Sequence, residues 1–312
     1  MMLTAITPPV GNLAHLAEVI VCPACRGDLH LHDGALFCGA CGWRSAVRDA
    51  IPDLALFDGL PGFAVETGEG QTYQHKYTEA AASAAYNGQF IRNRHKQART
   101  RRELDILRAL LGRIGRVERV LNLPSGGGRL SRPLSSMARL LVEADISIAQ
   151  TRHARTYGSY DPSGTTAFAS ASGFHLPFGD GAFDITVCAR LLHHFSAPSD
   201  HRRLVSELCR VTRRWVILSF NDQYSVKAIL RRLRGETTPM TLTRQSVRDL
   251  ASEAGFGWRE SMTVSPLGSR HTYALLERRA AFGSCDRALA VLGPGHGHLR
   301  ISDCVSGRLT IS

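Results

Sequence analysis

The fold is decided by residues 120–130, which read VLNLPSGGGRL. An apolar run with β-branched residues passes into three successive glycines, and a helical stretch follows, an order typical of a strand, a tight turn and a helix. Glycines let the backbone come close to a ligand, and the N-terminus of the next helix offers free N–H groups to an anionic group. A glycine-rich loop alone is equally compatible with an ordinary turn, so the rest of the chain must decide.

Short apolar runs recur along the chain, and stretches with helical spacing lie between them. Helices are predicted over 199–212 and 243–255, and the second has Thr243 as its N-cap and Gly255 as its terminator. The predicted strands span 117–123, 139–145, 183–190 and 214–220. Strands that alternate with helices predict an α/β fold with a Rossmann-like, doubly wound and mainly parallel sheet.

Before this region, two Cys-x-x-Cys pairs are separated by 12 residues and supply Cys22, Cys25, Cys38 and Cys41. Four thiolates at this spacing suit a tetrahedral structural zinc, which leaves no open coordination position for catalysis. We expect Gly27 and Gly42, just past the two pairs, to take the positive φ that each turn needs. The alternative is two unligated buried pairs. A redox role is less favoured, because it would need only one such pair.

The residues around these cysteines also carry a resemblance. The pattern is Cys-Pro-x-Cys-x-Gly-x-Leu, then Cys-x-x-Cys-Gly, then Ile-Pro-Asp-Leu, over about residues 15–57. It resembles the small zinc-ribbon family related to the activator subunit of tRNA and protein methyltransferases. This resemblance implies a ribbon fused ahead of a methyltransferase domain.

Further motifs follow the glycine loop in order. Residues 143–147 read EADIS and end the second predicted strand, where a carboxylate can hold ribose hydroxyls. Residues 176–184 read LPFGDGAFD, and 187–195 read VCARLLHHF. Over about residues 117–278 this succession resembles the class I S-adenosylmethionine-dependent methyltransferases, in particular the type 11 group that shares L-P-F-x-D-x-x-F-D.

The resemblance implies methyl transfer from S-adenosylmethionine and suggests where this cofactor binds. The methionine part would lie against residues 122–128, the ribose against Asp145 and the adenine beside residues 172–173, while residues 188–190 would face the methyl group and the acceptor. The cofactor-binding residues expected in this way are Asn122, Leu123, Pro124, Ser125, Gly126, Gly128, Asp145, Ile146, Ser172, Gly173 and Cys188.

Three residues depart from the family's pattern. The family usually has an acidic residue at the position of Asn122, and often has Gly at that of Pro124 and Asp at that of Ser172. Asn122 can form hydrogen bonds but supplies no charge to the cofactor's ammonium group. These departures leave open a non-catalytic zinc-ribbon interaction module with a degenerate methyltransferase fold.

No catalytic residue follows from the motifs, because proximity alone can drive many methyl transfers. Arg190, His193 and His194 are the candidates near the expected acceptor side. For the two adjacent histidines, packing is the simpler interpretation, with a role as a base as the alternative.

The net charge of +11 favours anionic partners, including nucleic acid. Six basic residues and no acidic one lie between Arg92 and Arg102, and a second cluster comprises Arg231, Arg232 and Arg234. A solvated helix face is the simpler interpretation, because no aromatic residues for base stacking are interleaved. We therefore expect a small-molecule acceptor, with RNA as the alternative.

The chain is expected to divide into a zinc ribbon (1–58), a linker with a basic amphipathic helix (59–115), a methyltransferase domain (116–279) and a poorly ordered tail (280–312). The tail contains His296 and His298, for which solvation is a simpler interpretation than metal binding. Neither a secretory signal nor an apolar run of about 20 residues is visible. We therefore expect a cytoplasmic protein whose cysteines are thiols or metal ligands.

Overall fold

The computed structural model describes residues 10–55, 79–236, 240–265, 267 and 269–280. The described residues up to Arg278 belong to one unit. The predicted tail lies outside the described residues except for Ala280, and so does the stretch 59–78 of the predicted linker. Among the described residues, no helix is long and apolar enough to cross a membrane.

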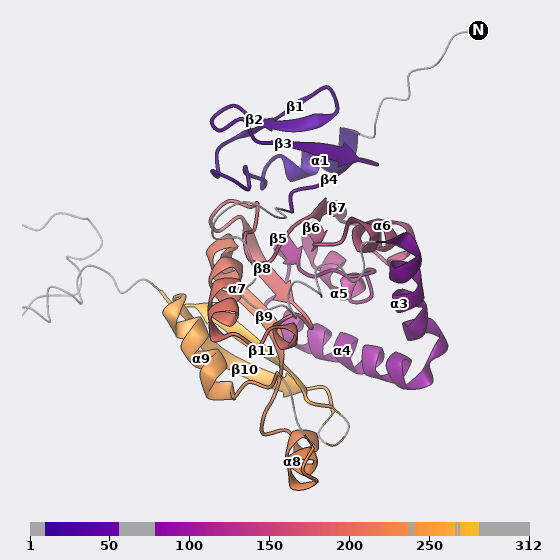
Figure 1. Cartoon of the computed structure of the whole chain (residues 1–312), viewed down its shortest axis with the longest axis vertical. Coiled ribbons are helices and arrows are strands. Elements are labelled where there is room, and N and C mark those ends of the chain that lie inside the picture. Colours follow the sequence, from indigo (N-terminus) through magenta and orange to yellow (C-terminus); the bar gives the residue numbers. More distant parts are fainter. Residues whose placement is uncertain (1–9, 56–78, 237–239, 266, 268, 281–312) are drawn as a thin grey trace, which may run out of the picture. The chain divides into compact units, whose positions relative to one another are not determined.

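A seven-stranded sheet lies at the centre of the larger part of the molecule, in the order β10-β11-β9-β8-β5-β6-β7 (Figure 1). The five strands from β9 to β7 are parallel, and β11 and β10 are added antiparallel at one edge. The prediction of a doubly wound, mainly parallel sheet is thus confirmed. The strands span Val117–Asn122 (β5), Ala138–Asp145 (β6), Thr165–Ser170 (β7), Phe183–Cys188 (β8), Thr212–Asn221 (β9), Phe256–Thr263 (β10) and His271–Arg278 (β11).

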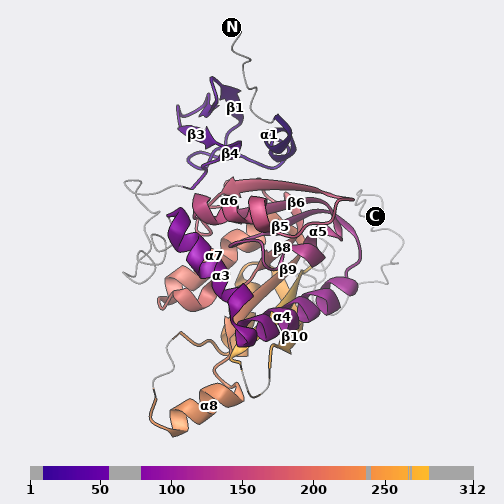
Figure 2. The same ribbon diagram turned by 90° about the vertical axis from the view of Figure 1, so that its right-hand side faces the viewer.

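Helices cover both faces of this sheet (Figures 1 and 2). On one face, α4 and α5 place apolar residues such as Leu107 and Leu134 in a core cluster with the strands. On the other, α7 and α9 contribute Leu204 and Val247 to a second cluster. The helices span Ala80–Arg92 (α3), Arg94–Gly112 (α4), Ser131–Ser135 (α5), Ile148–Tyr157 (α6), Pro198–Val211 (α7), Val226–Leu233 (α8) and Arg244–Glu253 (α9), and Leu192–His194 form a 3₁₀ turn (η1).

The position of β5 determines where a ligand can enter. It lies between β8 and β6, so the chain proceeds from β5 to β6 on one side and reaches β8 on the other. In an open α/β sheet this reversal of strand order leaves a crevice at the carboxyl ends of the strands, where ligands bind. The glycine loop leaves β5 at this point.

The N-terminal region forms a second, small sheet in the order β1-β2-β3-β4, preceded by helix α1. Its elements span Val10–Leu16 (α1), Leu29–His32 (β1), Ala35–Cys38 (β2), Arg44–Arg48 (β3) and Ile51–Pro52 (β4). We refer to residues 10–55 as the ribbon.

The ribbon is joined by hydrogen bonds to β7, the edge strand of the large sheet. The side chain of Asn12 donates to the carbonyl of Phe168 (3.0 Å) and accepts from its N–H (2.7 Å). The N–H of Leu54 donates to the carbonyl of Ser170 (2.9 Å). Backbone groups that an edge strand leaves open are therefore partly satisfied by the ribbon.

The ribbon also contacts the segment that contains the LPFG motif. The N–H of Val21 donates to the carbonyl of Pro177 (2.9 Å), and the N–H of Gly179 donates to the carbonyl of Val19 (3.1 Å). Leu16, Val19 and Phe178 are buried in the same core cluster. The ribbon is therefore packed against the large sheet through apolar side chains as well as hydrogen bonds.

Candidate active site and metal centre

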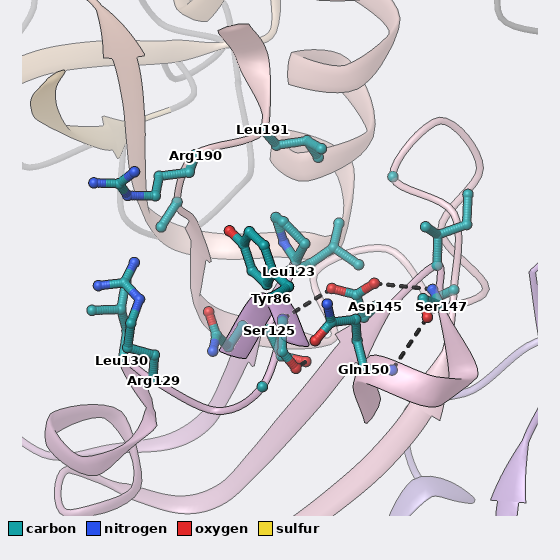
Figure 3. A pocket seen from close by; sticks show the side chains of 18 of the residues that line it. Tyr86, Leu123, Ser125, Arg129, Leu130, Asp145, Ser147, Gln150, Arg190 and Leu191 are labelled. Atoms are coloured by element: carbon teal, nitrogen blue, oxygen red, sulfur yellow. Dashed lines mark hydrogen bonds between the residues drawn. The ribbon is translucent and has the colours of Figure 1, made fainter. Parts of the chain in front are cut away.

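A cavity lies at the carboxyl ends of β5, β6 and β8, where three of the sequence-predicted stretches meet (Figure 3). Tyr86 lies between its two ends. Arg129 and Arg190 lie at one end, and Asp145 and Ser147 lie at the other. The predicted cofactor-binding residues that line this cavity are Asn122, Leu123, Pro124, Ser125, Gly126, Asp145, Ile146, Ser172 and Gly173.

Two residues of the predicted set do not line the cavity. A Cβ at Gly128 would lie 3.0 Å from the hydroxyl of Tyr160 and 3.1 Å from the Cα of Gly158, so this glycine packs against the end of α6. Cys188 is fully buried in a core cluster, and the next residue, Ala189, takes its place in the cavity. Successive strand residues point to opposite faces, and this alternation separates the two.

Asp145 is held by backbone groups at the end of β6. Its carboxylate accepts hydrogen bonds from the N–H of Gly126 (2.9 Å) and the N–H of Ser147 (2.9 Å). Burial raises the pKa of Asp145 to about 6, although these N–H groups oppose the rise. Each carboxylate oxygen has a second lone pair available for a ligand hydroxyl.

Asn122 and Glu143 form a buried pair on neighbouring strands. The amide of Asn122 donates to Glu143 Oε2 (3.1 Å), while Asn122 Oδ1 is buried and has no hydrogen-bond partner. Burial raises the pKa of Glu143 to about 8. The carboxyl group that is missing at position 122 is thus present one strand away, mostly in its neutral form at pH 7.

Helix α3 contributes a wall of the cavity that the sequence patterns did not indicate. Tyr86, Asn87 and Phe90 line the cavity, and the amide of Asn87 donates to Gln150 Oε1 (2.8 Å). A Cβ at Gly127 would lie 2.3 Å from Asn87 Oδ1. The middle glycine therefore makes room for α3, while Gly126 adopts a positive φ of 54°.

A buried ion-pair network lies at the other end of the cavity. Glu103 of α4 is fully buried and contacts Arg129 (2.6 Å) and Arg190 (2.6 Å). Burial alone would raise the pKa of Glu103, but the two guanidinium groups lower it below its usual value. Arg190 has a φ of 62°, and its N–H donates to Ser219 Oγ (2.7 Å). This left-handed conformation is uncommon for a residue with a side chain and is often found at functional sites.

The two candidate histidines lie beside this network and do not line the cavity. They form the turn η1, and the ring of His193 packs against those of His194 (centroids 4.2 Å apart) and His271 (5.0 Å). Burial, together with the neighbouring His194 and His271, lowers the pKa of His193 well below its usual value. His193 is therefore a neutral, packed side chain.

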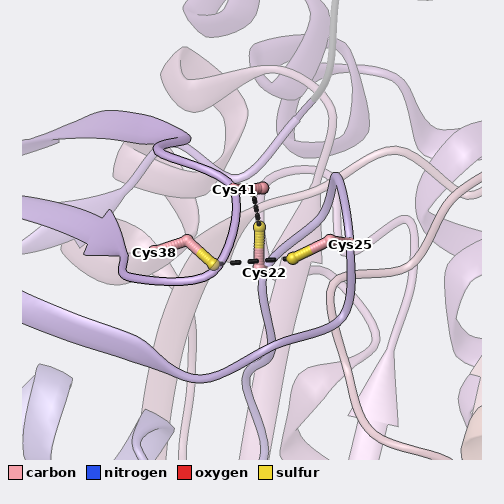
Figure 4. Close-up of side chains that lie close together, drawn as sticks. All are labelled: Cys22, Cys25, Cys38 and Cys41. Carbon is pink, nitrogen blue, oxygen red and sulfur yellow. Dashed lines mark hydrogen bonds between the residues drawn. The ribbon is translucent and has the colours of Figure 1, made fainter.

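The four cysteines of the ribbon lie together, as their spacing predicts (Figure 4). All four sulfur atoms lie within 4.8 Å of one another, with Sγ–Sγ distances of 3.6 Å for Cys22–Cys41 and 3.5 Å for Cys25–Cys38. The N–H groups of Cys41 and Ala40 lower the pKa of Cys38 to about 7. Burial raises the pKa of Cys22 to about 12, so only Cys38 is biased towards the thiolate; the close grouping of four sulfur ligands is what suits a divalent metal ion.

The prediction for the two glycines of the ribbon is only half right. Gly42 adopts a positive φ of 75°, but in the first turn Arg26, with a φ of 63°, takes the corresponding position directly after Cys25. Gly27 is required for space instead, because a Cβ there would lie 3.3 Å from the sulfur of Cys25.

Residues 121–220 match the family model of the methyltransferase domain. This match covers the glycine loop, Asp145 and the LPFGDGAFD motif. Together with the fold and the cavity, it identifies a class I S-adenosylmethionine-dependent methyltransferase domain, and thus an enzyme. A search of curated proteins finds no significant match.

Solved structures show the same fold at low sequence identity. The magnesium protoporphyrin IX methyltransferase of Synechocystis PCC 6803 with bound SAH has a TM-score of 0.55 and 17% identity, over 67% of this chain and all of that chain. Its form with bound SAM has a TM-score of 0.52 and 16% identity, over 69% of this chain and 100% of that chain. A complex of the Haloferax volcanii Trm112 methyltransferase activator and a methyltransferase has a TM-score of 0.49 and 16% identity, over 66% of this chain and 98% of that chain, and supports no conclusion about this chain.

Proposed function

We propose that the enzyme transfers the methyl group of S-adenosylmethionine to a small-molecule acceptor. The observation that carries this proposal is the convergence of residues 122–126, 145–146 and 172–173 on one cavity at the carboxyl edge of the sheet. Nine of the eleven residues predicted for the cofactor, from motifs far apart in the chain, line this cavity.

The chain's polar groups fit the parts of this cofactor. Asp145, fixed by two backbone N–H groups, is suited to accept from the two ribose hydroxyls. Asn122 Oδ1, which is buried and lacks a partner, is suited to accept from the ammonium group. Buried polar atoms normally have partners, and a ligand is one way to supply them. Ser172 and Gly173 line the same cavity and would flank the adenine.

When bound, the cofactor supplies a methyl group on a positively charged sulfur. This chemistry would suit an acceptor that has a free lone pair and a proton that it can release. The cavity wall formed by Tyr86, Phe90 and Arg190 would position the acceptor and exclude water. Positioning the acceptor and excluding water require no protein base.

Two observations favour a small acceptor over structured RNA. Arg129 and Arg190, at one end of the cavity, are already paired with the buried Glu103. In the basic stretch, Arg101 and Arg102 are exposed whereas Arg99 is half-buried. Not every cation of the stretch is therefore fully exposed to a nucleic-acid backbone.

We also propose that Cys22, Cys25, Cys38 and Cys41 hold one structural Zn²⁺. The short distances between their sulfur atoms support a closed tetrahedral site. Such an ion would stabilise the ribbon and leave the methyl transfer to the large sheet.

The test of the proposed function is label transfer from methyl-labelled S-adenosylmethionine in a cell extract. We expect label in the low-molecular-mass fraction, unchanged when the extract is first treated with ribonuclease. Label that appears only in RNA would contradict a small acceptor. Absence of any cofactor binding in calorimetry would contradict methyl transfer itself.

A further inference from the structure

A second cavity, of about 120 Å³, lies at the same edge of the sheet and has a strongly cationic lining. Four basic side chains line it: Arg99, Lys227, Arg231 and Arg270. Its other lining residues are Asn221, Ser269 and His271, so none of the described residues that line it is acidic. Arg231 is paired with Glu236 (2.7 Å), which itself lies outside this lining.

Several polar atoms at this cavity are buried and lack a hydrogen-bond partner. They include Arg270 Nη1, which is a donor, and Asn221 Oδ1, which is an acceptor. Leaving such groups unsatisfied costs free energy, so a native site that gathers them is expected to bind something. The unpaired guanidinium donor of Arg270 suits an anion, and the unpaired amide oxygen of Asn221 suits a neighbouring N–H or O–H group.

The electrostatics of the lining also favour an anion. Burial and the nearby Arg231 lower the pKa of Arg270, and burial followed by Arg190 lowers that of Arg99. Burial, with further contributions from Arg190 and Arg99, lowers the pKa of His271 to about 2, so its imidazole is neutral. Positive charge is therefore concentrated here with too few counter-charges, and a bound anion would relieve it.

This cavity is adjacent to the proposed acceptor end of the first one. Asn221 ends β9 and lies opposite His271, which begins β11, while Arg190 follows the neighbouring strand β8. Arg99 and Glu103 are four residues apart on α4 and therefore share a face, and Glu103 bonds to Arg190, which lines the first cavity.

We propose that this second cavity holds the anionic group, a carboxylate or a phosphate, of the small-molecule methyl acceptor. The inference rests on the proposed function and narrows its substrate class to anions that also carry an N–H or O–H group. Arg270 and Arg99 bind the anion, and Asn221 accepts from the neighbouring donor. The recessed position of these cations suits a single small group better than an extended RNA backbone.

The first experiment measures anion binding without any methyl transfer. Inorganic phosphate and acetate are titrated into the full-length protein, and thermal unfolding is followed at an ionic strength held constant with KCl. Phosphate or acetate should raise the unfolding temperature of the wild type, because a ligand that binds only the folded state stabilises it. Arg270→Gln and Arg99→Gln should each weaken the anion's apparent affinity about 10- to 100-fold.

The matched control is Arg232→Gln, which also replaces one arginine by glutamine. Arg232 lies on α8 next to Arg231, which does line the cavity. The guanidinium of Arg232 donates to the carbonyl of Gln223 (2.8 Å) and does not line the cavity. Equal anion responses in wild type and Arg270→Gln would overturn the proposal, as would an equal loss in the Arg232→Gln control.

The second experiment compares methyl acceptors in pairs, each a carboxylate or phosphate monoester and its neutral ester or amide. We expect label transfer to the anionic member, and Arg270→Gln should raise its KM about 10- to 100-fold while the affinity for S-adenosylmethionine stays unchanged. Equal use of both members by wild type and variant would overturn the anion site. Transfer to RNA that depends on Arg101 and Arg102 would also overturn it. A wild type that binds phosphate but not S-adenosylmethionine would instead contradict the proposed function alone.

Discussion

The cysteine cluster and the cofactor cavity are assembled from pieces at very different distances along the chain. The four sulfur atoms come from two turns within residues 22–41. The cavity draws on residues from Tyr86 to Phe195, on α3 and on loops after β5, β6, β7 and β8. A metal site made of local turns depends on spacing alone, whereas a cleft between strand ends depends on the order of the strands and on what packs against them. The two sites should therefore respond very differently to single substitutions.

The largest effect is expected in the cysteine cluster. Cys38→Ser removes one of four thiolates, and structural zinc contributes roughly 10–16 kcal/mol to the folding of comparable small modules. We expect the zinc content, measured by elemental analysis, to fall from about one ion per chain to nearly none. The large sheet should retain most of its secondary structure in circular dichroism, because its core clusters are mainly its own.

The matched control for this substitution is Cys209→Ser, which alters a buried cysteine of α7 that does not belong to the cluster. This variant should keep its zinc while losing some stability. Full zinc occupancy in Cys38→Ser would contradict the proposed ligand set.

A smaller effect is expected where one side chain meets one part of the cofactor. Asp145→Ala removes charge-assisted hydrogen bonds to ribose and should weaken the binding of S-adenosylmethionine by about 1.5–3 kcal/mol in calorimetry. The control is Asp184→Ala, because Asp184 also accepts from two backbone N–H groups, those of Glu118 and Arg119. Asp184 lies near the start of β8, so its loss should lower stability without lowering affinity. An Asp145→Ala variant with wild-type affinity would show that the site is misplaced.

The pH dependence of cofactor binding should separate the two carboxyl groups of this site. Asp145, whose pKa burial raises to about 6, is mostly ionised at pH 7 and mostly protonated at pH 5. Glu143, with a pKa of about 8, stays protonated over this interval. Affinity for S-adenosylmethionine should therefore fall roughly tenfold from pH 7 to pH 5. Asp145→Asn should bind more weakly than wild type and show a flat profile.

The contribution of Asp145 to the stability of the unbound protein should change with pH in the opposite direction to the cofactor affinity. Because the pKa of Asp145 is raised in the folded state, its contribution to stability is lost as the pH rises through about 6 and is regained on acidification. Protonation of Asp145 therefore does not destabilise the folded protein at pH 5. A fall in the affinity for S-adenosylmethionine at pH 5 that depends on Asp145 is thus a loss of binding and not a loss of the folded state. An affinity that rises on acidification would contradict the assigned role.

The smallest effect tests how α3 completes the cavity. In Gly127→Ala the new methyl group would meet the Asn87 side chain, which must move, at a cost of about 1 kcal/mol. We expect a modest loss of both stability and cofactor affinity. Asn87→Ala combined with Gly127→Ala should restore much of the packing loss, and no such recovery in the double variant would contradict the contact.

Sequence reasoning reached the parts of the site that are encoded in continuous motifs. The glycine loop and Asp145 follow predicted strands, so the parallel sheet brings them to one edge, and Cys22 to Cys41 form their cluster through local turns. The family resemblance also implied that Cys188 and Gly128 bind the cofactor, because each motif was taken as a unit. In the structure, the alternation along β8 and the packing of Gly128 on α6 leave both residues out of the cavity lining.

Residues that reach the cavity from outside the motifs could not be predicted. Tyr86 and Asn87 lie in an alanine-rich stretch whose sequence carries no sign of a binding role, and only the docking of α3 on the glycine loop places them. The same holds for Glu103, whose partners Arg129 and Arg190 are 26 and 87 residues away. The charge of the basic stretch suggested a solvated face, but it does not reveal that Arg99 turns inward.

The joining of the ribbon to β7 has a consequence for the order in which the chain is synthesised. Asn12 and Phe168 are 156 residues apart, and at about 5–20 residues per second the ribosome needs roughly 8–30 s to make the intervening chain. The ribbon therefore emerges well before the strand whose edge it covers. When β7 leaves the ribosome, the ribbon that binds its edge has already been synthesised on the same chain. The open edge therefore has little time to pair with the strand of another nascent molecule. Placed after the sheet, the same ribbon would leave that edge exposed throughout its own synthesis.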